Sequence, residues 1–252
     1  MKRFSCSSEY YNSIAKVYDS MYEDEYWQVA RKQIEMAILK YKPQLDGAKI
    51  LDVGAGTGYW SFWALQRGAQ VTLVEPAENM LKIAKEKIAQ VGLLEKARFI
   101  NSTAEQMDEY IDEQFDVIFA LGDVLSYVSD LDKVLSVLSK ISSPNALMFA
   151  TVDNYYSYLK DVIIHGTWED YRTLERKKRL PIGSEHGVFE ARCFTAEEIK
   201  LLVKQHSFQA IEIEALAAFD KVEKALRYGK YLVNELEHLF IILRNSKGNC
   251  ST

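Results

Sequence analysis

The sequence has few of the residues that build disulfide frameworks or metal sites. Its 252 residues include three cysteines, Cys6, Cys193 and Cys250, and four histidines. An odd number of widely separated cysteines gives no disulfide framework and is typical of a reducing compartment such as the cytoplasm. Neither the cysteines nor the histidines show the spacing of metal ligands, so we expect no metal site.

Long apolar runs and excess positive charge are also absent. No segment approaches the roughly 20 apolar residues of a membrane span, and the short polar start does not resemble a signal peptide. A net charge of −5 argues against a general nucleic-acid binder. The 48% of hydrophobic residues are enough for the core of one large α/β domain. We therefore expect a single cytoplasmic domain over residues 1–252 that neither crosses a membrane nor binds nucleic acid.

The most informative stretch is residues 48–76, where three glycines follow a short apolar segment typical of a buried parallel strand. Gly54, Gly56 and Gly58 let the backbone turn tightly and bring its N–H groups close to a ligand. A helix and a second strand then lead to the acidic residue Glu75. This order predicts a βαβ unit that binds a nucleoside, with a carboxylate for two ribose hydroxyls.

The glycine spacing separates two classes of nucleoside ligand. A dinucleotide site needs its third glycine five positions after the first, and Tyr59 occupies that position here. Residues 51–58, Leu-Asp-Val-Gly-Ala-Gly-Thr-Gly, instead resemble the first motif of the class I S-adenosylmethionine-dependent methyltransferases, with Asp52 as its acidic residue. The resemblance covers residues 10–152 well and residues 194–244 in outline.

The resemblance implies an α/β fold of the Rossmann-like kind. Its seven-stranded sheet is mostly parallel, has helices on both faces, and has its last strand antiparallel between two parallel ones. The hydrophobic pattern agrees, because strands and helices alternate strictly as far as a strand over residues 146–152 that follows a Pro144-Asn145 turn. Further along, we expect a strand over residues 210–213, a helix over about 220–235 and the last strand over 237–244.

Two segments stand outside this alternation. Residues 153–194 show little strand pattern and are too long for an ordinary connection, so we read them as a small cap insert that covers the substrate cavity. Residues 1–41 are predicted to form a helical lid, and segment 11–19 is similar to the start of many small-molecule methyltransferases. That likeness implies that Tyr11, Tyr18 and Tyr22 fold over the cofactor. Their amphipathic spacing allows the alternative that the rings cover the sheet edge.

The resemblance also implies S-adenosylmethionine as the cofactor. Where the family usually places an Asp for the adenine amino group, this chain has Thr103, whose hydroxyl accepts a hydrogen bond without charge. Glu105 is the alternative partner, or else a helix cap. The implied cofactor-binding residues are Tyr11, Tyr18, Tyr22, Asp52, Gly54, Ala55, Gly56, Gly58, Glu75, Pro76, Met80, Thr103, Ala104, Glu105, Leu121, Gly122 and Ser126.

The chemistry needs little from the protein beyond placement. The sulfonium already activates the methyl group, so in-line transfer depends on bringing a nucleophile close in a cavity with little water. The catalytic residues are not fixed by the motif, and the candidates for a general base are Tyr18, Asp123, His165 and His186. Asp123 could equally hold the amino acid end of the cofactor.

The sequence of the loop that starts at Leu121 gives information about the methyl acceptor. It is similar to the loop of small-molecule methyltransferases such as those that methylate glycine, and it lacks the Asn/Asp-Pro-Pro-Tyr sequence of enzymes acting on nucleic-acid bases or protein amides. We therefore expect transfer to a nitrogen or oxygen atom of a small molecule. Two other functions stay open at this point: a nicotinamide-dependent oxidoreductase, and a non-catalytic protein that binds S-adenosylmethionine.

Overall fold

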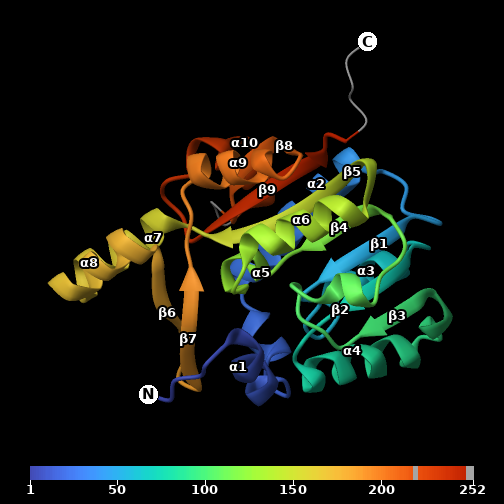
Figure 1. Ribbon diagram of the computed structural model, residues 1–252, viewed down its shortest axis with the longest axis horizontal. Helices are drawn as coiled ribbons and strands as arrows, with labels where there is room; N and C mark the ends of the chain where they lie inside the picture. Colours follow the sequence, from blue (N-terminus) through green and yellow to red (C-terminus); the bar gives the residue numbers. More distant parts are fainter. Residues whose placement is uncertain (218–220, 248–252) are drawn as a thin grey trace, which may run out of the picture.

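The computed structural model describes residues 1–217 and 221–247. A seven-stranded sheet forms the centre of the molecule (Figure 1). Its strands are β1 (Lys49–Val53), β2 (Gln70–Val74), β3 (Ala97–Ile100), β4 (Phe115–Ala120), β5 (Ser142–Asp153), β8 (Phe208–Ala215) and β9 (His238–Asn245).

The strand order across the sheet is β3-β2-β1-β4-β5-β9-β8. The pairs among β1 to β5 are parallel, whereas β9 is antiparallel to both of its neighbours, β5 and β8. The expected Rossmann-like sheet, with its last strand antiparallel between two parallel ones, is therefore confirmed. The chain order reverses direction across the sheet between β1 and β4, which is where ligands of open α/β sheets bind.

Helices cover both faces of the sheet (Figure 1). In β4, Val117 and Phe119 pack on one side, and Ile118 and Ala120 pack on the other. Burial on both faces explains why the central strands are almost continuously apolar in sequence. One face carries α2 (Glu25–Tyr41), α3 (Tyr59–Leu65), α4 (Glu78–Gln90) and α10 (Val222–Tyr228); the other carries α5 (Val124–Tyr127), α6 (Leu131–Ile141) and α9 (Ala196–Gln205).

The remaining elements lie outside this layered core. In Figure 1 the hairpin of β6 and β7 extends away from the sheet beside α1. Tyr10 of α1 packs on Phe189 of β7, with ring centroids 5.2 Å apart. These elements are α1 (Ser7–Ile14), α7 (Tyr155–His165), α8 (Trp168–Lys177), β6 (Arg179–Ser184), β7 (Gly187–Arg192) and the short 3-10 helices η1 (Asp19–Tyr22), η2 (Leu94–Lys96), η3 (Met107–Glu109) and η4 (Gly229–Tyr231).

The predicted lid, residues 1–41, divides into two parts. α1 and η1 pack beside the hairpin and the loop after β4. α2, in contrast, is a core helix, because Ile34 and Ile38 are buried in the same cluster as Phe240 and Ile242 of β9.

Several sequence expectations need correction. The insert contains a regular hairpin that the pattern did not reveal, because β6 carries Pro181 and Gly183 and pairs only with β7. Pro144 lies inside β5, where Asn145 adopts a positive φ of 63°, and is not part of a turn before the strand. The helix expected over about 220–235 ends as α10 at Tyr228 and continues only as η4.

Parts of two expectations fall outside the described residues, namely the start of that helix at position 220 and Cys250. Among the described cysteines, Cys6 is exposed and Cys193 is buried, and both are free thiols. Over residues 1–217 and 221–247, no helix combines the length and the apolar character that a bilayer span requires.

Candidate functional site

The three glycines after β1 form a tight turn at the carboxyl end of the strand. Gly54, Gly56 and Gly58 have φ values of 66°, 55° and 81°, a left-handed conformation that favours glycine. There is also no room for a side chain at Gly58, since a Cβ there would lie 2.8 Å from the Cβ of Ala84 on α4. The turn therefore needs glycine both for its backbone angles and for the close approach of the helix.

Glu75, directly after β2, faces this turn across the crevice. Its Oε2 accepts a hydrogen bond from the N–H of Gly56, and its Oε1 accepts one from the N–H of Ala77, both at 2.8 Å. The residue is only 6% exposed. Burial raises the pKa of Glu75 to about 7, although the two backbone hydrogen bonds favour the ionised form. The carboxylate thus joins the two loops that the βαβ unit brings together.

Three adjoining cavities lie along the carboxyl edge of the sheet. We name each by one lining residue: the Glu75 cavity of about 190 Å³, the Arg31 cavity of about 130 Å³ and the Asp153 cavity of about 690 Å³. Tyr127 lines all three, and Gly122 lines the first two. His238 lines the Arg31 and Asp153 cavities. The shared residues show that the three spaces adjoin one another.

Most of the residues that the sequence assigns to a cofactor gather around the Glu75 cavity. They come from α1, the glycine turn and the loops after β2, β3 and β4, which are far apart in sequence. The predicted residues that line it are Tyr11, Gly54, Gly56, Glu75, Pro76, Met80, Thr103, Ala104, Glu105 and Gly122.

Other predicted residues do not line this cavity. Asp52 is buried behind the glycine turn, where its Oδ2 accepts a hydrogen bond from the Ser61 hydroxyl at 2.6 Å. Burial raises the pKa of Asp52 to about 7. Tyr22 lines the Arg31 and Asp153 cavities instead, and Tyr18 packs on its ring at 4.7 Å. The remaining four, which line none of the three cavities, are Ala55, Gly58, Leu121 and Ser126.

The side chain of Glu105 is hydrogen-bonded to another loop of the protein. Its Oε1 accepts hydrogen bonds from the N–H and the hydroxyl of Ser129, both at 2.8 Å. Glu105 therefore fastens the loop after β4 to the loop after β3. Sequence reasoning missed further lining residues, because no motif marks them and only the fold brings them here: Cys6, Ser7, Ser8, Val124, Tyr127, Val128 and Ser129.

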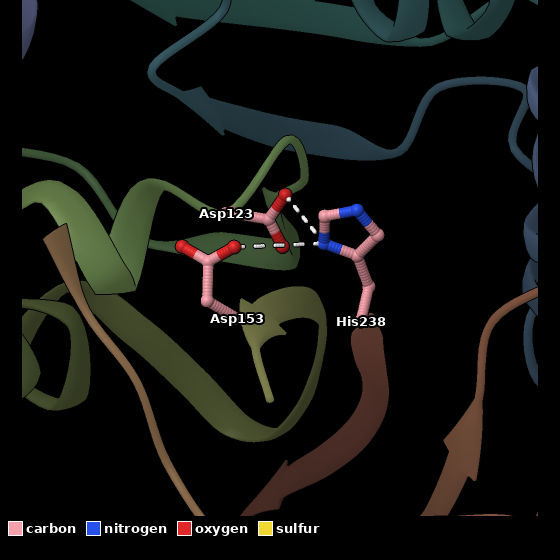
Figure 2. Close-up of side chains that lie close together, drawn as sticks. All are labelled: Asp123, Asp153 and His238. Atoms are coloured by element: carbon pink, nitrogen blue, oxygen red, sulfur yellow. Dashed lines mark ion pairs between the residues drawn. The ribbon is translucent and has the colours of Figure 1, made fainter. Parts of the chain in front are cut away.

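Two carboxylates and an imidazole meet where the Arg31 and Asp153 cavities adjoin (Figure 2). Asp123 follows β4, Asp153 ends β5 and His238 begins β9. The Nδ1 atom of His238 lies 3.1 Å from Oδ2 of Asp123 and 3.8 Å from Oδ1 of Asp153. The expectation that the histidines join no cluster of metal-ligating residues is therefore wrong for His238, which the antiparallel β9 carries to this edge of the sheet.

The three groups perturb one another. Burial, reinforced by the neighbouring Asp123 carboxylate, raises the pKa of Asp153 well above its usual range. Burial on its own would lower the pKa of His238, but the charge and hydrogen bond of Asp123, together with the charges of Asp153 and Glu237, outweigh it and raise that pKa to about 9.

The other candidate bases are placed differently. His165 and His186 line none of the three cavities, and neither does Tyr18. Asp123 is the candidate base that lies at a cavity junction, and it lies there with two residues that the sequence did not single out.

Comparisons with known proteins agree with this geometry. Residues 50–145 match a family model described as a methyltransferase domain. The chain is 30% identical over 159 residues to the ubiquinone biosynthesis O-methyltransferase of Pseudomonas aeruginosa, covering 59% of this chain and 67% of that protein. The chain belongs to the class I S-adenosylmethionine-dependent methyltransferases. S-adenosylmethionine is its cofactor, which removes the nicotinamide-dependent oxidoreductase from consideration.

The relatives of this methyltransferase differ in what their names say they act on. It is 29% identical over 164 residues to protein arginine N-methyltransferase 6 of Xenopus tropicalis, covering 64% of this chain but only 45% of the length of that relative. Its fold matches the 1,6-didemethyltoxoflavin-N1-methyltransferase of Burkholderia thailandensis, solved with S-adenosylhomocysteine, with a TM-score of 0.60 and 17% identity over 98% of this chain and 93% of the other.

Proposed function

We propose that this methyltransferase transfers the methyl group of S-adenosylmethionine to a nitrogen or oxygen atom of a small molecule held in the Asp153 cavity. The observation that carries the proposal is the contiguity of the three cavities through Tyr127, Gly122 and His238. An elongated cofactor that occupies the first two cavities has its sulfonium methyl group between them, near Tyr127, which also lines the third cavity. Methyl transfer then depends mainly on that placement.

The nucleoside half of the cofactor fits the Glu75 cavity. We assign its ribose hydroxyls to the Glu75 carboxylate, which lies beside the glycine turn as in other nucleoside-binding βαβ units. Met80 and Thr103 line the same cavity on the side toward β3, and we assign them to the adenine. Tyr11 of α1 closes the space from the N-terminal side.

The amino acid half fits the Arg31 cavity. Arg31 provides the cationic guanidinium among its lining residues and is held over the Tyr59 ring at 4.1 Å. A guanidinium is the group that best recognises a carboxylate, because its N–H donors match the two oxygens. Arg31 is therefore our candidate for the carboxylate of the methionine half, a residue for which the sequence provided no signal.

The Asp153 cavity has the size and the walls of an acceptor site. Its volume of about 690 Å³ falls in the range of small-molecule sites. Part of its wall comes from the insert, through Tyr158, Ile182 and Phe189, and part from α1 and η1. Residues 153–194 thus act as the cap over the substrate in this proposal. Tyr22 and Tyr127 separate the acceptor from solvent near the transfer point.

Incubation of the full chain with methyl-labelled S-adenosylmethionine and a cell extract tests the proposal. We expect label in the low-molecular-mass fraction. Label found only in the protein fraction would instead support a protein acceptor, as the name of the Xenopus relative suggests for that enzyme. S-adenosylhomocysteine binding without transfer to any fraction would leave the non-catalytic alternative.

The labelling also needs a variant that distinguishes transfer in this cavity from transfer elsewhere. Gly183 lines the Asp153 cavity with a φ of 151° and close contact to Gly187, so it is unsuitable for substitution. Ser157→Trp on α7 instead fills the cavity from a half-exposed position. We expect it to suppress labelling while leaving S-adenosylhomocysteine affinity unchanged, and full labelling in this variant would place the acceptor elsewhere.

A further inference from the structure

We propose that Asp123, Asp153 and His238 bind a divalent first-row transition-metal ion where the Arg31 and Asp153 cavities adjoin (Figure 2). The site itself stands on the geometry of these three side chains. The role given to the ion below, and with it the class of acceptor, rests on the proposed methyl transfer.

The spacing of the ligand atoms fits a metal ion. One ligand atom from each residue lies within 4.8 Å of the other two, and Nδ1 of His238 is 3.1 Å and 3.8 Å from oxygens of Asp123 and Asp153. Ligands bonded at about 2.1 Å in an octahedral arrangement are separated by roughly 3 Å for neighbours and 4 Å for opposite positions. Acceptors around an ammonium, at about 2.8 Å each, would be spread to roughly 4.6 Å. The two separations that involve His238 are shorter than this, which favours a metal ion over an amine.

Each of the three residues also leaves one polar atom without a hydrogen-bond partner. These atoms are Oδ1 of Asp123, Oδ2 of Asp153 and Nδ1 of His238. The two carboxylate side chains are only 5% and 6% exposed. Burying polar atoms without partners is unfavourable, and buried carboxylates are usually paired or bound to metal. A cation among the three groups supplies a partner for Nδ1 of His238 and for the carboxylate of Asp123, whereas Oδ2 of Asp153 is not the oxygen that faces His238.

The backbone around the cluster is held in place by neighbouring hydroxyls. Oγ1 of Thr151 on β5 accepts hydrogen bonds from the N–H groups of Gly122 and Asp123, at 3.0 and 2.9 Å. Oγ of Ser126, three residues after Asp123, accepts one from the N–H of Asp153 at 2.9 Å. The loop after β4 and the end of β5 therefore fix each other, as a site that must present ligands at set distances requires.

A carboxylate also lies near the other nitrogen of His238, beyond hydrogen-bond distance. Nε2 lies 3.8 Å from Oε2 of Glu237, and imidazoles that bind metal through one nitrogen usually have a carboxylate or carbonyl near the other. The rings of Trp27 and Tyr26 pack against the imidazole at 5.5 and 6.3 Å and limit its rotation. Nδ1 is thus directed toward the two aspartates.

The donor set identifies the kind of ion. One imidazole nitrogen and two carboxylate oxygens suit Mn²⁺, Fe²⁺ or Zn²⁺, whereas Ca²⁺ and Mg²⁺ prefer oxygen ligands alone. Three protein ligands leave coordination positions open to another molecule. Asp153 and His238 line the acceptor cavity, whose lining residues in the described chain include no lysine or arginine. We therefore place the ion as the positive charge nearest the acceptor among the cluster residues.

This placement points to a hydroxyl as the acceptor. A metal ion lowers the pKa of a bound hydroxyl, so that its oxygen attacks as the alkoxide or phenolate. The hydroxyl proton is released to water. The oxygen–carbon bond forms as the sulfur–carbon bond breaks, and sulfur keeps the bonding electron pair to give S-adenosylhomocysteine.

Titration of the full chain with Mn²⁺, followed by the electron paramagnetic resonance signal of the free ion, tests the site. We expect one ion bound per chain, and Asp153→Asn and His238→Gln each to weaken binding at least tenfold. Asp161→Asn is the matched control, because Asp161 lines the same cavity outside the cluster and should leave Mn²⁺ affinity unchanged. The circular dichroism spectrum and the thermal unfolding midpoint, measured in parallel, report whether each variant is folded.

Several results would overturn the inference. The first is that the chain binds S-adenosylhomocysteine but no Mn²⁺, and the second is that Asp153→Asn binds Mn²⁺ as tightly as the wild type. The third is that the chain binds tetramethylammonium in place of Mn²⁺, which would assign the carboxylates to an amine. The outcome is separable from that of the proposed function. A chain that binds Mn²⁺ through these residues but methylates nothing would keep the site and refute the activity.

Discussion

Replacement of Glu75 by glutamine gives the sharpest test of the cofactor site. The wild-type carboxylate accepts two backbone hydrogen bonds and faces the Glu75 cavity. Glu75→Gln keeps the side-chain volume but removes the charge that we assign to the ribose hydroxyls. A charge-assisted hydrogen bond contributes about 1.5–3 kcal/mol, so we expect S-adenosylhomocysteine to bind roughly 10- to 150-fold more weakly at pH 8.

The pH dependence follows from the same residue. Burial raises the pKa of Glu75 to about 7 from its ordinary 4.5, so the folded apo chain holds the proton more tightly than the unfolded chain. The free energy of unfolding should fall as the pH rises from 4.5 to 7, by up to about 3 kcal/mol. Ribose hydroxyls donate to the ionised form, so cofactor binding should favour deprotonation. We expect wild-type affinity to drop roughly tenfold from pH 8 to pH 6.

Isothermal titration calorimetry with S-adenosylhomocysteine at pH 6, 7 and 8 measures both effects. Glu75→Gln should show weak binding that does not vary over this range. Asp52→Asn is the matched control, because burial raises the pKa of Asp52 to about 7 as well, but Asp52 does not line the cavity and should leave the pH dependence of binding intact. Wild-type affinity in Glu75→Gln, or a wild-type affinity that does not change with pH, would refute the assignment.

Three further results are expected. Gly58→Ala should lower the free energy of unfolding by about 2–3 kcal/mol in urea titrations. Gly92 has a similar positive φ, but no atom lies within 4 Å of the point that an added Cβ would occupy, so Gly92→Ala should lower it by only about 1 kcal/mol. Equal losses would show that the contact with Ala84 is unimportant. Thr103→Asp should tighten cofactor binding if this residue meets the adenine, and unchanged affinity would place the adenine elsewhere. Arg31→Gln should weaken binding of S-adenosylhomocysteine but not of adenosine, which has no carboxylate; a parallel loss for both would contradict our placement of the methionine half.

The glycine turn and the sheet were predictable because their causes are local. Gly54, Gly56 and Gly58 adopt positive φ angles that other residues disfavour, so the residue types alone are enough to predict the turn. The capping box of Thr195 and Glu198 at the start of α9 is equally local, with hydrogen bonds in both directions between residues three positions apart. Apolar runs interrupted by such signals are enough to define an alternating α/β order.

The hairpin of the insert was harder to predict, because neither of its strands joins the central sheet: β6 pairs with β7, and β7 is bridged to Arg3 near the N-terminus. Pro181 and Gly183 weaken the strand pattern of β6, and the hairpin is stabilised by contacts to α1, which is about 170 residues earlier in the chain. No local pattern reports such contacts.

The chain by itself determined the part of the crevice that we assign to the nucleoside, since a strand, a glycine turn and an acidic residue on the next strand are neighbours in sequence and follow from short-range geometry. Only the tertiary structure decided the cluster that we assign to the reacting end. His238 reaches Asp123 and Asp153 because β9 runs antiparallel beside β5, which brings the start of the last strand to the carboxyl ends of the parallel ones. Strand direction and neighbour are set by packing over the whole sheet, so residues more than 80 positions apart acquired a common chemistry that their spacing did not reveal.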